Sequence, residues 1–335
     1  MVTYDGRVID HSDPRNITTS EGQSYAMFFA LVNNDRTLFN DLLLWTQDNL
    51  AGGDLSSNLP AWLWGRKPDG QWGVLDSNAA SDSDLWIAYN LLEAGRLWGE
   101  RQYTIMGNQL LRQIARREIT QLPGFGPMLL PAPFGFVRDQ IWRLNPSYLP
   151  PQIIARLAEE QSILWRDLSD VLPRFLTETS PIGIAPDWIS WVASENENGA
   201  FRSLTERDAL GSYDAIRVYL WIGMLDDAYA PAKALKRHVS AIGKYVNEQG
   251  RVAEKINIHT GASESFGGPG FSAALLPLFT GQPLETQLLA NLKNAASSEL
   301  GYYNQMLSLF GLGWHDGRYR FDAQGRLLPA WKSCR

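Results

Sequence analysis

Residues 82–118 read DSDLWIAYNLLEAGRLWGERQYTIMGNQLLRQIARRE, and this stretch decides the fold class. Apolar residues recur along it every three to four positions, the spacing typical of helices that bury one face or more. The part before Gly99-Glu100 is the more apolar, whereas the part after it carries more charge. The stretch therefore predicts two helices, 82–98 and 101–118, joined by a short link. A buried helix followed by a half-exposed one is the pairing that an inner and an outer ring of helices require.

The same pairing recurs along the rest of the chain. The first helix of a pair is the more apolar, as in 20–33 and 270–279, and the links between partners are short. Strand signals are few, and 135–144 and 317–328 are predicted to be hairpins. No repeat or low-complexity linker divides the sequence, so we expect one domain, 1–335, of the all-α class with small β-hairpins. The other predicted helices are 36–50, 150–160, 162–179, 212–225, 231–247, 284–297 and 301–312.

Composition and charge exclude several classes of protein. The 30 basic and 36 acidic residues give a net charge of −6, so a nucleic-acid-binding protein is not expected. The longest apolar runs, 26–32 and 218–225, are far shorter than the roughly 20 residues of a membrane-spanning helix. The single cysteine, Cys334, permits no internal disulfide, and four scattered histidines form no metal-binding motif. We therefore expect no membrane insertion, no cofactor and no metal, although calcium bound by carboxylates is left open.

The unusual feature of the composition is its aromatic content of 13 Trp, 12 Tyr and 13 Phe. Carbohydrate-active proteins use flat aromatic rings as stacking surfaces for sugars, but an aromatic-rich core would give the same composition. Trp62, Trp64 and Trp72 lie in a stretch that contains Gly and Pro, which predicts a loop outside the core. Trp188 follows a Pro-Asp turn. For each of these side chains, sugar contact and structural packing are alternative interpretations.

Carboxylates stand at the starts of three of the apolar helices. Glu21, Asp82 and Asp214 each fall in a predicted first turn. If all inner helices run in one direction, their N-termini lie at one end of the ring, and the three carboxylates lie there together. Paired carboxylates are the catalytic groups of glycoside hydrolysis. Capping is the alternative interpretation, because Thr18-x-x-Glu and Ser81-x-x-Asp both fit a capping box.

The segment 80–98 resembles the signature of glycoside hydrolase family 8, with Ser83 where the usual form has Gly or Ala between the two aspartates. The resemblance extends from Gly6 to Trp331, and it is strongest to the endoglucanases that accompany bacterial cellulose synthase. It implies an (α/α)6 barrel. Because eleven helices are predicted rather than twelve, one outer helix is undetected or irregular. Further matching segments are 19–25, 145–151, 180–188, 212–219 and 302–304.

The resemblance also implies a reaction, the inverting hydrolysis of β-1,4-glucan, and roles for particular residues. Glu21 matches the general acid and Asp214 the general base, while Asp82 matches the carboxylate that holds a distorted sugar at the central subsite. Tyr148 lies where a tyrosine positions the attacking water. Arg217, one turn after Asp214, would keep that base ionised. The aromatic residues expected to contact the glucan are Trp62, Trp64, Trp188, Tyr213, Tyr302 and Tyr303.

The sequence leaves other functions open. The same barrel can hydrolyse chitosan, whereas a polysaccharide lyase would need basic residues that the candidate segments lack apart from Arg217. A non-catalytic glucan-binding subunit of a cellulose secretion system would not need Glu21, Asp82 and Asp214 together. Nothing at the N-terminus is typical of a targeting segment. Because family precursors carry a signal peptide, we expect a periplasmic or secreted protein that binds a β-1,4-glucan chain and transiently contacts the cellulose synthase machinery.

Overall fold

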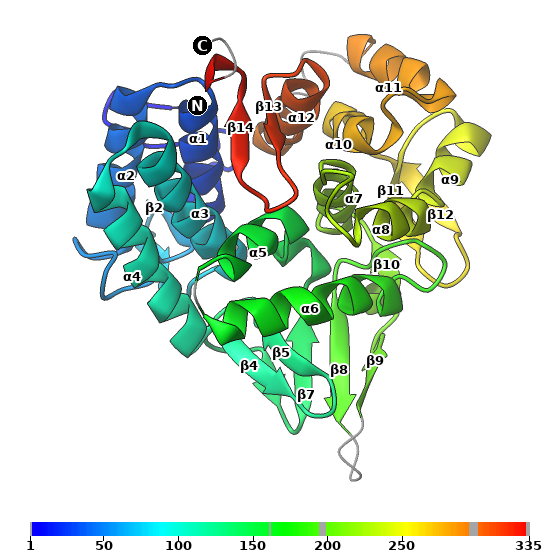
Figure 1. Cartoon of the computed structure of the whole chain (residues 1–335), viewed down its shortest axis with the longest axis horizontal. Helices are drawn as coiled ribbons and strands as arrows, with labels where there is room; N and C mark the ends of the chain where they lie inside the picture. The colour runs from blue at the N-terminus through cyan, green and yellow to red at the C-terminus, as the bar shows by residue number, and fades with distance from the viewer. Residues whose placement is uncertain (1, 161, 194–198, 295–300, 333–335) are drawn as a thin grey trace. The chain divides into compact units, whose positions relative to one another are not determined.

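The computed structural model describes residues 2–160, 162–193, 199–294 and 301–332 (Figure 1). The chain divides into two compact units. The first consists of Met1–Ile119, Leu129–Phe136 and Pro329–Arg335, and the second of Thr120–Met128 and Val137–Leu328. Helices dominate both units, and short strands lie between them, so the helix-rich class expected from the sequence is confirmed.

The helices of the first unit form pairs. They are α1 (Ser20–Val32) with α2 (Arg36–Leu50), and α3 (Ser81–Trp98) with α4 (Arg101–Arg117). The first member of each pair is buried along almost its whole length, because apolar or small residues occupy nearly every face. The second member buries only one stripe of side chains. The predicted succession of buried and half-exposed helices is therefore confirmed in this unit.

Helices α1 and α3 pack against each other and run in the same direction. Near their starts, the ring of Tyr25 packs edge-on against Trp86, with centroids 5.7 Å apart. At the other end, the indole N–H of Trp98 donates a hydrogen bond to the Asn34 side chain at 2.8 Å. The N-termini of the two buried helices consequently lie at the same end of the pair.

The second unit contains the remaining long helices of the described chain. Helices α7 and α10 are buried throughout, α10 packs against α7, α11 and α12, and α5 packs against α6. The helices of this unit are α5 (Pro151–Ala158), α6 (Ile163–Glu178), α7 (Ala215–Gly223), α8 (Ala232–Val239), α9 (Ile242–Gln249), α10 (Pro269–Phe279), α11 (Pro283–Lys293) and α12 (Tyr302–His315).

The buried helices α7 and α10 also run in the same direction. Tyr213, just before α7, packs edge-on against Phe271 in the first turn of α10, with ring centroids 5.2 Å apart. In the last turn of α7, Gly223 lies so close to α10 that a Cβ atom there would be 2.6 Å from the backbone nitrogen of Leu278. The start of α7 therefore contacts the start of α10, and the last turn of α7 contacts the last turn of α10, so the two helices are parallel.

Helix α12 follows the same direction. Tyr303 in its first turn packs against Tyr213 with ring centroids 5.6 Å apart. Two turns later, Phe310 packs edge-on against Trp221 of α7 at 5.2 Å. Helices α1 and α3 in the first unit, and α7, α10 and α12 in the second, thus each begin at the same end as their partners, as expected from the sequence.

Two helix predictions need correction or restriction. The predicted helix 231–247 is wrong, because the structure breaks it into α8 and α9 at Ser240. There the Ser240 hydroxyl donates to the Arg237 carbonyl oxygen, and Gly243 N–H bonds to the carbonyl of Ser240, three residues earlier, which tightens the turn. The predicted helix 284–297 corresponds to α11, and its last residues, 295–297, lie outside the described residues.

Small sheets connect the helices, and the predicted hairpins 135–144 and 317–328 are confirmed. The other strands were missed, because most span only two to five residues. The sheets are β1 (Thr18–Thr19), β2 (Leu63–Arg66) and β3 (Trp72–Asp76); β4 (Ile119–Leu122) and β5 (Gly126–Leu129); β6 (Val137–Arg138), β7 (Ile141–Leu144), β8 (Ile189–Ala193) and β9 (Gly199–Arg202); β10 (Leu210–Gly211), β11 (Ala253–Asn257) and β12 (Ser263–Phe266); and β13 (Tyr319–Phe321) with β14 (Leu327–Pro329).

The C-terminal segment closes the first unit. The indole N–H of Trp331 donates to the carbonyl oxygen of Leu31 at 3.2 Å, and the ammonium group of Lys332 donates to that of Leu97 at 3.1 Å. The bond from Lys332 gives a partner to a carbonyl group in the last turn of α3, and the bond from Trp331 adds a donor to the Leu31 carbonyl, which also accepts from Asn34 N–H. Cys334 lies outside the described residues. No helix in the described part of the chain is long and apolar enough to cross a bilayer.

Candidate active site

Glu21 lies in the first turn of α1, as predicted, and is half-buried. The N-cap of this helix is Thr19, whose side-chain oxygen accepts a hydrogen bond from Gly22 N–H at 3.1 Å. The hydroxyl of Thr18 instead donates to the carbonyl oxygen of Val8 at 2.6 Å. The Thr18 hydroxyl therefore does not cap α1, and the side-chain cap of this helix is the neighbouring Thr19.

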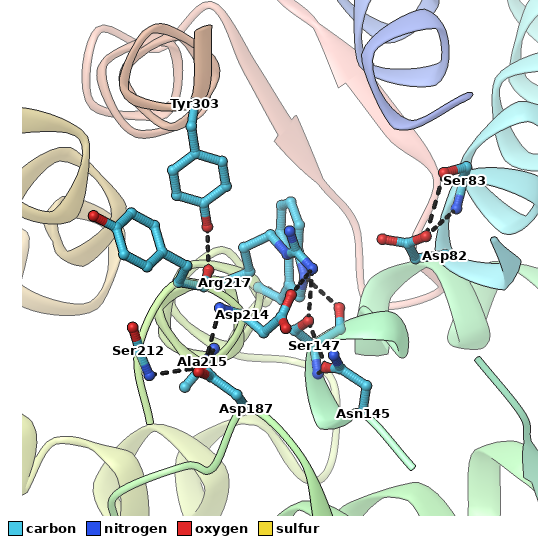
Figure 2. A network of polar contacts seen from close by, with 12 residues as sticks. Asp82, Ser83, Asn145, Ser147, Asp187, Ser212, Asp214, Ala215, Arg217 and Tyr303 are labelled. Carbon is cyan, nitrogen blue, oxygen red and sulfur yellow. Dashed lines mark hydrogen bonds and ion pairs between the residues drawn. The ribbon is translucent and has the colours of Figure 1, made fainter. Parts of the chain in front are cut away.

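Asp82 lies in the first turn of α3 and is only 4% exposed. Its carboxylate accepts hydrogen bonds from the backbone N–H of Ser83 at 2.7 Å and from the Ser83 hydroxyl at 3.2 Å (Figure 2). The N-cap of α3 is Ala80, which provides no side-chain cap, and Ser81 is already inside the helix. The predicted capping box beginning at Ser81 is therefore wrong.

Asp84 forms a buried pair with Glu118, which follows the last residue of α4. Both side chains are fully buried, and no N–H or O–H group of the described residues donates to their carboxyl oxygens. Each carboxyl alters the pKa of the other. Burial raises the pKa of both groups well above its usual range, and the negative charge of Asp82 raises both further.

The pair with Asp84 was not found from the sequence, although a signal was present. Glu118 stands at the C-terminal end of a helix, where the macrodipole disfavours negative charge. An acid in this position suggests a partner elsewhere in the fold. Its backbone also has a structural role, since its carbonyl oxygen accepts a hydrogen bond from Leu130 N–H at 2.7 Å.

Asp214 is the N-cap residue of α7 rather than a residue of its first turn, but its side chain caps nothing. Its carboxylate accepts a hydrogen bond from the guanidinium of Arg217 at 2.8 Å (Figure 2). The same Arg217 nitrogen donates to the Ser147 hydroxyl at 2.9 Å, and that hydroxyl donates to the Asn145 side chain at 2.8 Å. Because only 5% of the Arg217 side chain is exposed, a permanent positive charge is held in one place beside Asp214.

A second acid, Asp187, lies at the same helix start (Figure 2). One of its oxygens accepts hydrogen bonds from the backbone N–H groups of Ser212, Asp214 and Ala215, at 2.7, 3.0 and 2.8 Å. Burial and repulsion from Asp214 raise the pKa of Asp187 to about 6, against the lowering effect of the three N–H donors. Asp187 belongs to the Pro-Asp-Trp segment, and no role for it was predicted from the sequence.

Tyr148 and Trp188 lie close to the Asp214–Arg217 pair. The guanidinium carbon of Arg217 is 5.9 Å from the centre of the Tyr148 ring, and the Tyr148 and Trp188 rings are 6.3 Å apart. Arg143, which was missed, lies over the Trp188 ring at 5.1 Å and pairs with the buried carboxylate of Asp208 at 2.9 Å. The structure thus gathers these predicted site residues around the start of α7.

Tyr213 and Tyr303 belong to the same group. The ring of Tyr213 is 47% exposed, and the Tyr303 hydroxyl donates to the Tyr213 carbonyl oxygen (Figure 2). Tyr302, the neighbouring residue of α12, is half-buried. Tyr148, Tyr213 and the pair 302–303, which are far apart in sequence, therefore all lie in the second unit.

The prediction that Trp62, Trp64 and Trp72 lie in a loop is wrong for two of them, because they belong to strands β2 and β3. The rings of Trp64 and Trp72 are stacked with centroids 5.3 Å apart, and the guanidinium carbon of Arg7 lies 4.4 Å from the Trp64 centroid. Trp45 packs edge-on against Trp64 at 5.3 Å. Trp64 is thus largely occupied by packing within the first unit.

Trp62 connects this sheet to the start of α1. Its backbone carbonyl oxygen accepts a hydrogen bond at 3.0 Å from the N–H of Ser20, one residue before Glu21. Its backbone N–H donates to the carbonyl oxygen of Asn78 at 2.8 Å. The hydrogen bond from the Asn78 backbone, followed by that from the Trp62 side chain, lowers the pKa of Asp76. Trp62 therefore fixes the backbone beside Glu21.

Carboxylates stand at the starts of buried helices in each unit, and Asp or Glu carboxylates are the catalytic groups of most glycoside hydrolases. Within the described residues, no group of three or more His, Cys, Asp or Glu side chains could hold a metal ion. Residues 1–317 match the model of glycosyl hydrolases family 8. The chain belongs to this family and is a glycoside hydrolase.

Individual relatives are similar along almost the whole chain. The endoglucanase of Escherichia coli (strain K12) is 46% identical over 333 residues, which cover 98% of this chain and 88% of the relative. The endoglucanase of Xanthomonas axonopodis pv. citri (strain 306) is 47% identical over 339 residues, covering 99% and 87%. The crystal structure of an endo-1,4-D-glucanase from Vibrio fischeri ES114 superimposes with a TM-score of 0.91 at 44% identity, covering 99% of this chain and 96% of the other.

Proposed function

We propose that this glycoside hydrolase is an endo-β-1,4-glucanase that cleaves cellulose-type chains with inversion of configuration. The observation that carries the proposal is the similarity to proteins named endoglucanase, which covers 98–99% of this chain. The chitosanase and the non-catalytic binding subunit have no comparable support among these relatives.

Asp214 would act as general base and Glu21 as general acid. A base must be ionised to take a proton from water, and the buried guanidinium of Arg217, 2.8 Å from Asp214, favours the charged carboxylate. Glu21 would protonate the leaving oxygen from its half-buried place in the first turn of α1. Tyr148 would position the attacking water, since it lies beside Arg217.

Asp82 would hold the distorted sugar at the central subsite. Its oxygen is kept in place by both donors of Ser83, so its position is fixed before substrate arrives. The glucan would contact Trp62, Trp64, Trp188, Tyr213, Tyr302 and Tyr303; of these, the ring of Tyr213 offers an exposed surface.

We also propose that the two compact units are parts of one catalytic domain, 1–335, with the (α/α)6-barrel architecture. The parallel buried helices within each unit support this proposal. The protein would act in the periplasm or outside the cell, in cellulose biosynthesis, with transient contact to the synthase.

The test is sugar release from carboxymethyl cellulose and from chitosan by the full chain. We expect release from carboxymethyl cellulose only, and Glu21→Gln should abolish it while glucan binding persists, because Gln cannot deliver a proton. Release from chitosan alone would replace the proposal with a chitosanase. Binding of glucan without any release would identify a non-catalytic subunit.

A further inference from the structure

Two acids lie at the start of α7: Asp214 pairs with Arg217, and Asp187 accepts hydrogen bonds from the backbone. A helix N-terminus leaves backbone N–H groups without partners, and the N-cap side chain usually accepts from one of them. Here the N-cap residue is Asp214, but its carboxylate is turned to Arg217. Asp187, from a segment more than twenty residues earlier, accepts instead from the N–H groups of Asp214 and Ala215, and from that of Ser212, two residues before the N-cap.

The segment that carries Asp187 is itself tied to α7. The Ala185 N–H donates to the hydroxyl of Tyr219, in the middle of α7, at 2.9 Å. The Ala185 carbonyl lies so close to Gly211 that a Cβ atom on that glycine would be 2.0 Å from its oxygen. Asp187 N–H also donates to the carbonyl oxygen of Leu210 at 3.0 Å. These contacts fix Asp187 relative to the turn that it caps.

We propose that Asp187 is a positioning residue for Asp214: by accepting three N–H groups around that residue, it fixes the backbone from which the Asp214 carboxylate reaches Arg217. The proposal rests on the proposed function, in which Asp214 is the general base. Asp187 does not need to touch substrate for this role.

The choice of a carboxylate rather than an amide has a physical consequence. A charged acceptor forms hydrogen bonds to N–H groups that are roughly twice as strong as those of a neutral one. Burial and the charge of Asp214 raise the pKa of Asp187, so placing two acids together is unfavourable in itself. Their mutual repulsion favours the Asp214 carboxylate on the side of Arg217, away from the capping oxygen.

The experiment compares Asp187→Ala and Asp187→Asn in the full chain, using steady-state hydrolysis of cellohexaose. Asp187→Ala should lower kcat about 10²-fold with little change in KM, because a displacement of about 1 Å in a reacting group can cost that much. Asp187→Asn keeps an acceptor oxygen and should stay within about tenfold of the wild type. Added azide, which can attack without a base, should raise the rate of Asp187→Ala.

Asp35→Ala is the matched control, since Asp35 caps α2 by accepting from Leu38 N–H at 3.0 Å. It should lower the melting temperature and leave kcat unchanged, which separates loss of a cap from displacement of a base. If Asp187→Ala does not fold, Asp187→Ser replaces it, because the shorter side chain cannot reach all three donors and should show the same fall in kcat.

Three results would overturn the proposal. One is a folded Asp187→Ala or Asp187→Ser enzyme with the wild-type kcat. Another is an equal loss in Asp187→Asn and Asp187→Ala accompanied by a raised KM, which would indicate substrate binding. If the wild type does not hydrolyse cellohexaose, the proposed function fails and this proposal fails with it; the first two results leave the proposed function intact.

Discussion

At the residue scale, the chemistry of Asp214 depends on neighbours of both signs. Arg217 is one turn away on the same helix, and Ser147 fixes the guanidinium from another segment. Asp187 lies on the other side, among the N–H groups of the helix start. The carboxylate is thus held between an attraction and a repulsion, which restricts its orientation.

Asp214→Asn should reduce hydrolysis of carboxymethyl cellulose by about 10²–10⁴-fold, because an amide cannot accept the proton of the attacking water. Its size is nearly unchanged, so the fold should be retained. Initial rates with and without azide measure the effect, and azide should partly restore the rate. Asp226→Asn is a suitable control, since Asp226 accepts a hydrogen bond from Ala228 N–H in the link after α7. Wild-type activity in Asp214→Asn would exclude Asp214 as the base.

At the element scale, the ends of α3 and α4 meet through the buried acids Asp84 and Glu118. The folded protein holds a proton there that the unfolded chain, with ordinary carboxyl groups, releases above about pH 4. In such a case the folded state binds more protons than the unfolded state. The stability contributed by the pair is therefore complete below about pH 4 and is lost as the pH rises toward the raised pKa values.

Glu118→Gln should remove part of this pH dependence. The Gln amide does not titrate, and its N–H can donate to Asp84 at any pH. The free energy of unfolding of the variant, relative to that of the wild type, should therefore be higher at about pH 8 than at about pH 5. Thermal unfolding at both pH values measures this, with the exposed Glu206→Gln as control. The same difference in stability between variant and wild type at the two pH values would contradict the raised pKa of Glu118.

The packing of α12 on α10 offers a second test at this scale. A Cβ atom on Gly311 would lie 1.9 Å from the carbonyl oxygen of Ala273, so the helices approach too closely for any side chain there. Gly311→Ala should lower the free energy of unfolding by about 1–3 kcal/mol, measured by urea denaturation. Gly301→Ala, where nothing lies within 4 Å, should have little effect. Equal stability of both variants would show that the helices can separate without cost.

At the scale of the whole molecule, the proposed acid and base come from different compact units. Inversion needs about 6.5–9.5 Å between the two carboxyl groups, so that water fits on the far side of the sugar, whereas retention needs about 5–5.5 Å. The stereochemistry of the product therefore reports the arrangement of Glu21 and Asp214 during turnover.

Proton NMR of the first products from a β-linked cello-oligosaccharide should show α-anomers before mutarotation. Water attacks from the face opposite the leaving group in an inverting enzyme, which reverses the anomeric configuration. Initial β-anomers would mean retention, and Asp214 would then no longer be assigned as a base.

The sequence by itself determined the helices and part of the site. The bounds of α1, α2, α3 and α4 lie within one residue of those predicted, because hydrophobic spacing is a local property. The ion pair of Asp214 with Arg217 was predictable for the same reason, since residues three apart on a helix are neighbours. The break at Ser240 was not predicted, because no Pro marks it and a single glycine such as Gly243 is tolerated within a helix.

Only the tertiary structure decided which polar groups meet and in what state. The strands are too short for a periodic signal, and the donors that surround Asp187 belong to a turn more than twenty residues later. Likewise, the pKa values of Asp84 and Glu118 are raised because packing removes water from both side chains, and no sequence spacing encodes that burial. Helical periodicity is fixed by neighbours along the chain, whereas desolvation and hydrogen-bond partners depend on contacts between segments distant in sequence.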